Sequence, residues 1–228
     1  MQEHPKEAES GLFDNPDWLQ IQECYRVLKK ANSNITWEIL RQSAPFVQWD
    51  HYPKGDVFDS ETQSQYYYHA HPAAVPSNTR DENGHFHLFL RKKGIPEHLK
   101  PIKMQKKGRP KGSKEDDVCH LIGISMNKQG YPIELFTTNR WVTGETWYDA
   151  DSVIELLDYF NIDHSYPSWP LNLWLSSIVR VYKKDIIALI KMRDETIQKW
   201  QEANLGINVY EDRGLEVTSS LILPEHTP

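Results

Sequence analysis

The sequence predicts an α+β fold with a central antiparallel sheet that bears a histidine-lined pocket, flanked by N-terminal and C-terminal helices. Three observations lead to this prediction. Runs rich in aromatic and β-favouring residues occupy the middle of the chain, helical hydrophobic spacing is confined to the two ends, and no internal repeat is present. Strands grouped between helices are typical of α+β proteins with an antiparallel sheet.

Two helices are expected before the first strand. The first begins at Asn15, a residue type that favours the N-cap, with Pro16 at the first helical position. Its apolar stripe consists of Trp18, Ile21, Tyr25 and Leu28. A shorter helix is expected over roughly residues 36–42. The segment 46–56 is expected to start extended and to become a loop at its proline and glycine.

Five strands and three further helices complete the expected fold. The strands are expected at residues 65–71, 85–91, 120–126, 133–138 and 215–223, with a turn at 127–130 that makes the third and fourth a hairpin. The helices, read from apolar residues repeating every three or four positions, are expected near 150–160, 171–182 and 186–200. The last strand is expected to rejoin the sheet at its edge.

Composition restricts the class of protein. The 228 residues are expected to form a single domain with a flexible N-terminal tail 1–13, a mobile basic loop 91–117 and a short C-terminal tail 224–228. A net charge of −6 argues against general attraction to nucleic acids, and two cysteines argue against a disulfide framework or a thiolate zinc cluster. No apolar run could span a bilayer and the N-terminus lacks a signal-peptide core, so we expect a cytoplasmic protein without membrane contact.

Two His-x-His pairs are the most informative motifs. They are His69–Ala70–His71 and His85–Phe86–His87, and both lie in expected strands. Side chains at positions i and i+2 of a strand share one face, so each pair offers two imidazoles side by side. His120 opens a third expected strand. If these strands are neighbours, up to five imidazoles converge, and a tri-histidine metal site needs only three.

The expected ligands fall into a first choice and alternates. The first choice is His85, His87 and His120, and the alternates or second site are His69 and His71. The first choice resembles, in geometry alone, the zinc site of animal-type carbonic anhydrases; the His-x-His and glutamate spacing of cupins is not matched. Glu82 is the candidate general base. A divalent transition metal is expected, zinc or iron foremost. In the alternative interpretation the histidines only pack the sheet.

The basic loop contains a short motif with a different implication. Its core is Lys107, Gly108, Arg109, Pro110 and Lys111. This core resembles the AT-hook of high-mobility-group chromatin proteins, with Lys107 in place of the hook's first arginine. The resemblance implies a weak, salt-dependent contact with the narrow minor groove of A·T-rich DNA. The alternative interpretation is a solvated basic loop.

A third candidate site lies in the polar and aromatic segment 136–147. Arg140 is the expected anchor for a carboxylate or phosphate of an unidentified small molecule, and Trp141 is expected to stack on it. The alternative is an ordinary strand-to-helix connection in which Arg140 pairs with Glu145.

Four motifs together resemble an uncharacterised bacterial family of unknown function. They are Gln65–His71, Gly84–His87, Phe136–Glu145 and Glu211–Arg213. The resemblance spans roughly residues 37–223 and implies no particular reaction. The sequence therefore predicts a cytosolic metal-binding protein, and the enzyme classes that suit such a site are metal-dependent hydrolases, lyases and oxygenases of unknown substrate. The alternatives are a non-catalytic DNA-associated protein and a scaffold, and the oligomeric state is left open.

Overall fold

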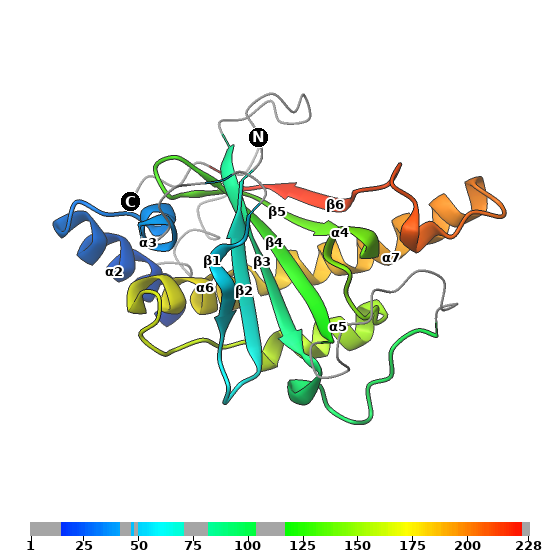
Figure 1. Cartoon of the computed structure of the whole chain (residues 1–228), viewed down its shortest axis with the longest axis horizontal. Coiled ribbons are helices and arrows are strands. Elements are labelled where there is room, and N and C mark those ends of the chain that lie inside the picture. Colours follow the sequence, from blue (N-terminus) through cyan, green and yellow to red (C-terminus); the bar gives the residue numbers. More distant parts are fainter. Residues whose placement is uncertain (1–14, 42–46, 48–49, 71–81, 104–116, 225–228) are drawn as a thin grey trace, which may run out of the picture.

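A six-stranded antiparallel sheet organises the computed structural model, which describes residues 15–41, 47, 50–70, 82–103 and 117–224. The strands lie in the same order in space as in the sequence, so the sheet is a simple meander (Figure 1). They are β1 (Tyr52–Phe58), β2 (Ser64–His69), β3 (Glu82–Arg91), β4 (Val118–Asn127), β5 (Pro132–Thr138) and β6 (Val217–Ile222). The predicted α+β class with a central antiparallel sheet is confirmed.

The α-helices that the structure describes lie before β1 and between β5 and β6, as predicted apart from one short helix at residues 140–143. They are α2 (Pro16–Lys30), α3 (Ile35–Leu40), α4 (Arg140–Thr143), α5 (Ala150–Leu156), α6 (Trp169–Val181) and α7 (Lys183–Ala203). Short 3₁₀ turns are η1 (Lys92–Gly94), η2 (Leu157–Tyr159) and η3 (Val209–Glu211). Among the described helices, none combines the length and the apolar content that crossing a bilayer requires.

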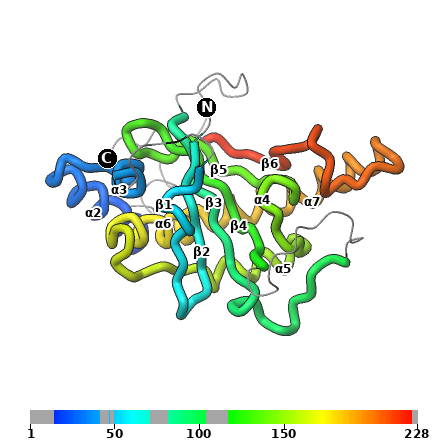
Figure 2. Tube along the Cα trace, in the orientation of Figure 1, coloured from blue at the N-terminus to red at the C-terminus, as the bar shows by residue number. Residues whose placement is uncertain are grey.

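The two faces of the sheet have different coverings. The strands lie in front of α6 and α7 in Figures 1 and 2, so these helices cover one face, here called the helix face. Tyr66, Tyr68, Phe86 and Leu88 point to that face and belong to the main hydrophobic core. Because side chains alternate along a strand, the residues between them point to the opposite face. That opposite face carries His69, His85 and His87 and is here called the histidine face.

Local sequence signals explain where the first helices begin. The Asn15 side chain accepts hydrogen bonds from the backbone N–H groups of Asp17 and Trp18, and Pro16 occupies the first turn. Asn34 caps α3 in the same way through the N–H of Trp37. Each cap satisfies donors that the first helical turn leaves without a partner.

The strand β1 was not expected, because its sequence contains the residues that usually interrupt strands. Pro53 lacks a backbone donor and Gly55 has a positive φ of 88°. The pairing of β1 with β2 is irregular between Tyr52 and Val57, so these residues lie in a bulged edge strand. A proline and a glycine are tolerated there because an edge strand is paired on one side only.

A second irregularity, in β4, decides the position of His120. Leu88 of β3 pairs with Ile122, but the next residue, Phe89, pairs with His120, so β4 has one extra residue at this point. The bulge lets Leu121 and Ile122 both join the core while His120 lies beside Phe89 on the histidine face.

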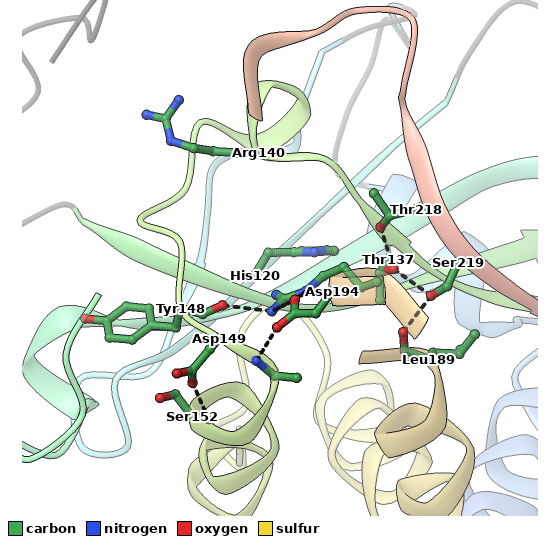
Figure 3. Close-up of polar contacts among 12 residues, drawn as sticks. His120, Thr137, Arg140, Tyr148, Asp149, Ser152, Leu189, Asp194, Thr218 and Ser219 are labelled. Atoms are coloured by element: carbon green, nitrogen blue, oxygen red, sulfur yellow. Dashed lines mark hydrogen bonds and ion pairs between the residues drawn. The ribbon is translucent and has the colours of Figure 1, made fainter. Parts of the chain in front are cut away.

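Buried polar contacts fix the helix face of the sheet to α7 (Figure 3). The Thr137 hydroxyl contacts those of Thr218 and Ser219 at 2.7 Å each, and Ser219 donates to the Leu189 carbonyl of α7. On the same helix, Asp194 accepts the backbone N–H of Ala150 at the start of α5. These contacts hold β5 and β6 in a fixed position, and both strands contribute to the site on the opposite face.

Candidate metal centre

Strand register brings three imidazoles together on the histidine face. His69 of β2 lies directly opposite His85 of β3, and His87 lies opposite Tyr67, which places it diagonally across from His69. Directly opposed side chains are 4.5–5.5 Å apart at Cβ, and diagonal neighbours are within reach of long side chains. One ring nitrogen from each of His69, His85 and His87 lies within 4.8 Å of the other two. We call these three residues the histidine triad.

The triad has nearly the dimensions of a metal site. Three atoms within 4.8 Å of one another share a point no more than about 2.8 Å from each (4.8 Å divided by √3), and zinc binds imidazole nitrogen at about 2.0–2.1 Å. Each ring therefore needs to move by less than about 1 Å to meet a metal ion. Movement of that size is available to imidazole rings through small changes of their side-chain torsion angles.

A carboxylate orients the first of these rings. Nδ1 of His85 lies 2.8 Å from Oε1 of Glu82, three residues earlier on the same strand. A neutral imidazole bonded in this way carries its proton on Nδ1 and leaves Nε2 as a lone pair. Metal-bound histidines usually have such a partner on the other ring nitrogen, because it fixes the tautomer and makes the ligand more basic.

His120 orients the ring of His87 in a similar way. Nδ1 of His87 lies 3.0 Å from Nε2 of His120. Burial lowers the pKa of His120 to about 3 and that of His87 well below its usual range, so both rings are neutral.

The arrangement that suits a metal ligand is the one in which Nδ1 of His87 donates to Nε2 of His120, because Nε2 of His87 then keeps its lone pair. That Nε2 atom is buried and has no hydrogen-bond partner among the residues that the structure describes. An unpaired buried nitrogen is unfavourable, and a metal ion at the triad would satisfy it.

Behind His120 lies a buried carboxyl group. Oε2 of Glu145 accepts the backbone N–H of His120 at 2.8 Å. Burial raises the pKa of Glu145 to about 7, although Arg193 and the His120 N–H oppose that shift. The contact holds β4 to the loop after α4 and thereby fixes the position of His120 next to His87.

A glycine allows an aromatic ring to close one side of the triad. A Cβ on Gly123 would lie 2.4 Å from the ring of Phe136, so only glycine leaves room for that ring. Phe136 lies across β4 and meets His85 and His87 edge to face, with ring centres 5.2 and 5.7 Å away. On the other side Tyr67 stacks on His51 at 3.6 Å.

The triad lines a cavity of about 710 Å³. Cavities of this size accommodate small organic molecules. The remaining wall combines carboxylates, hydroxyls and apolar groups with one arginine, and it consists of Glu82, Ser125, Glu134, Phe136, Thr138, Trp141, Val142, Arg213, Glu216, Val217 and Ser220. The triad is therefore accessible from a space that a substrate can enter.

The predicted site residues are distributed unequally around this cavity. The structure brings His69, His85 and His87 together, with Glu82 bonded to His85 and His120 bonded to His87. His120 thus contacts the triad through His87 and is not one of its three members, although the sequence predicted it as a metal ligand. His71 and the AT-hook-like residues Lys107, Gly108, Arg109, Pro110 and Lys111 lie outside the described residues. The expected contact of that motif with DNA stays a prediction.

Arg140 and Trp141 are adjacent in the sequence but lie in different environments. Trp141 lines the cavity, whereas Arg140 forms an ion pair with Glu211 and is not part of the cavity wall. Figure 3 shows the Arg140 side chain pointing away from His120. The arginine in the cavity wall is Arg213, which sequence reasoning did not single out. Its motif, Glu211–Arg213, was recognised only as part of the family resemblance.

Fold and site together define an α+β protein with a buried histidine cluster at a ligand-sized cavity. The chain belongs to the family described as "domain of unknown function (DUF6969)", whose model matches residues 18–223. The match covers every described strand and the whole cavity wall. Neither a curated protein nor a solved structure is significantly similar to the chain.

Proposed function

We propose that this protein binds a divalent transition metal through His69, His85 and His87 and uses it on a small molecule in the adjoining cavity. The observation that supports this most directly is the approach of three ring nitrogens to within 4.8 Å in the wall of a cavity of about 710 Å³. Zinc and iron both accept three imidazole ligands, and either ion suits this donor set.

The tri-histidine arrangement favours a catalytic site over a structural one. Structural zinc sites have four protein ligands, whereas catalytic sites have three and keep a position open. Here the triad supplies three nitrogens and faces the cavity. A metal held there would supply Lewis acidity and a bound water of lowered pKa, which suits a hydrolase, lyase or oxygenase.

The chain's own residues have distinct parts in this proposal. Glu82 holds the His85 ring and His120 holds the His87 ring through Nδ1, so Nε2 of each ring is the nitrogen that we assign to the metal. Glu82 also lines the cavity, which keeps it the candidate general base. Phe136 covers the edges of His85 and His87 and limits the access of bulk water to them.

Elemental analysis of tag-free protein tests the proposal. We expect about one equivalent of zinc or iron per chain, lost in His87→Ala and reduced in His69→Ala and His85→Ala. His98→Ala is the matched control, because His98 is exposed and pairs with Glu155 outside the cavity wall. Wild-type protein that stays empty after incubation with zinc or iron(II), or equal metal content in His87→Ala and wild type, would refute the proposal.

A further inference from the structure

Two motifs singled out in the sequence meet in the cavity wall next to β5 and β6, whereas the triad lies on β2 and β3. One is the turn Asn139–Arg140–Trp141 at the start of α4, and the other is Glu211–Asp212–Arg213, which begins at the last residue of η3. The Asn139 amide donates to the carbonyls of Val209 and Leu215, at 2.8 and 3.1 Å. The Trp141 indole N–H donates to the same Leu215 carbonyl at 2.8 Å. The two turns therefore form one built unit.

The acidic residues of the second motif are occupied within this unit. Glu211 pairs with Arg140. Asp212 accepts the indole N–H of Trp200 on α7 at 2.8 Å and the backbone N–H of Gly214 at 2.9 Å. The turn that carries Arg213 is thus fixed on one side to α7 and on the other to α4.

Arg213 is the cationic group of the cavity wall, and it is held by stacking. Its guanidinium carbon lies 5.0 Å from the centre of the Trp141 ring. Within the part of the chain that the structure describes, Arg213 forms no ion pair. A guanidinium stacked on an aromatic ring keeps its N–H edge available for two parallel hydrogen bonds to a carboxylate or phosphate.

A buried hydroxyl lies in the same region of the wall. Thr138 pairs with Val217 across β5 and β6, and both residues line the cavity. Oγ1 of Thr138 is buried and has no hydrogen-bond partner among the described residues. A buried hydroxyl without a partner is unfavourable in an empty site, and a ligand oxygen would satisfy it. We call Thr138, Trp141 and Arg213 the arginine pole.

We propose that the arginine pole binds the carboxylate of a small organic acid whose other end faces the histidine triad. The metal-facing half of this inference rests on the proposed function, whereas the carboxylate site stands on its own contacts. A monoanionic carboxylate fits better than a phosphate dianion, because Glu82, Glu134 and Glu216 line the same cavity and repel a second negative charge. The cavity thus selects a substrate with one planar anionic group.

Visible absorption of the cobalt-loaded chain reports ligands at the triad. The probes are ω-(imidazol-1-yl)alkanoates with one to five methylenes, and the corresponding imidazolyl alcohols serve as uncharged controls. We expect one chain length to bind about 10- to 100-fold more tightly than its alcohol, as one charge-assisted bidentate contact provides. Arg213→Ala should abolish that advantage, and Arg26→Ala should preserve it, because Arg26 is exposed on α2 and pairs with Glu23 outside the cavity wall.

A second measurement separates this inference from the metal proposal. In the metal-free chain, ligand-observed NMR should detect benzoate binding that Arg213→Ala abolishes. A chain that takes up no cobalt but binds benzoate through Arg213 would end the proposed function and leave the arginine pole intact. Benzoate binding that is absent in the wild type or unchanged in Arg213→Ala overturns the inference. Inorganic phosphate displacing benzoate more effectively than acetate overturns the carboxylate class.

Discussion

The two faces of β2 and β3 use the same backbone for different purposes. On the helix face, Tyr66, Tyr68, Phe86 and Leu88 are fully buried in the core that joins the sheet to the helices. On the histidine face, His69, His85 and His87 contact one another and line a cavity, and His85 also contacts the carboxylate of Glu82. One face therefore supplies folding free energy, and the other supplies a place for chemistry.

The largest expected difference between the faces appears in two adjacent residues of β3. Leu88→Ala should lower the free energy of unfolding by about 2–5 kcal/mol, because it leaves a cavity in a closely packed core. Its metal content should stay at the wild-type level. His87→Ala should show the opposite pattern and bind no metal. In the metal-free state it should lose less stability than Leu88→Ala, because Nε2 of His87 has no partner among the described residues.

Urea unfolding and elemental analysis of the two variants check this prediction together. Loss of metal in a folded Leu88→Ala variant would show that the two faces are not independent.

The buried carboxyl behind the histidine face gives a prediction for pH. The pKa of Glu145 is about 7 in the folded chain and about 4.5 when the group is exposed. At a pH between these two pKa values, Glu145 is protonated in the folded chain and ionised in the unfolded chain. Glu145 therefore lowers the free energy of unfolding as pH rises from about 4.5 to 7, by up to about 3 kcal/mol. Glu145→Gln keeps an acceptor for the His120 N–H and removes the titration.

The stability of Glu145→Gln relative to wild type should therefore increase by up to about 3 kcal/mol between pH 4.5 and 7.5. His87 and His120 act in the opposite direction, because their lowered pKa values reduce stability as pH falls below about 6.5 in both proteins. That contribution cancels in the comparison. Urea midpoints of the metal-free proteins measure the difference, with Glu61→Gln as a surface control. A difference that does not vary with pH contradicts the assignment.

A smaller effect is expected for the carboxylate that orients His85. Glu82→Gln keeps a hydrogen-bond acceptor near Nδ1 but removes the negative charge, so metal affinity should fall about 10- to 100-fold. Competition with a chromophoric chelator measures the change. Glu134→Gln is the matched control, since Glu134 lines the same cavity without a hydrogen bond to the triad among the described residues. Equal effects of the two substitutions would mean that only the overall charge of the cavity matters.

Local patterns were sufficient to predict most of the architecture. The helices at both ends follow from caps such as Asn15 and from apolar residues spaced three and four apart, and β2 to β6 follow from their aromatic and β-branched runs. The pairs His69–His85 and Tyr67–His87 required that two strands be antiparallel neighbours in one particular register. The strand β1 was missed because Pro53 and Gly55 indicate a turn, and only tertiary pairing reveals a bulged edge strand.

Long-range features of the site could not be read from local patterns. The position of His120 depends on a bulge in β4, which no spacing within that strand reveals. The choice between Arg140 and Arg213 depends on a turn more than 70 residues away, because Glu211 engages the former and Trp141 stacks on the latter. Strand alternation is a local property, whereas the meeting of two turns is a property of the whole fold.

X-ray absorption spectroscopy of the zinc-loaded, tag-free chain tests most directly whether His69, His85 and His87 bind one metal ion. We predict three imidazole nitrogens at about 2.0–2.1 Å with a remaining oxygen ligand, and one nitrogen fewer in the metal that His69→Ala retains. A wild-type spectrum with fewer than three imidazoles, or one that is identical in His69→Ala, would contradict a metal held by His69, His85 and His87.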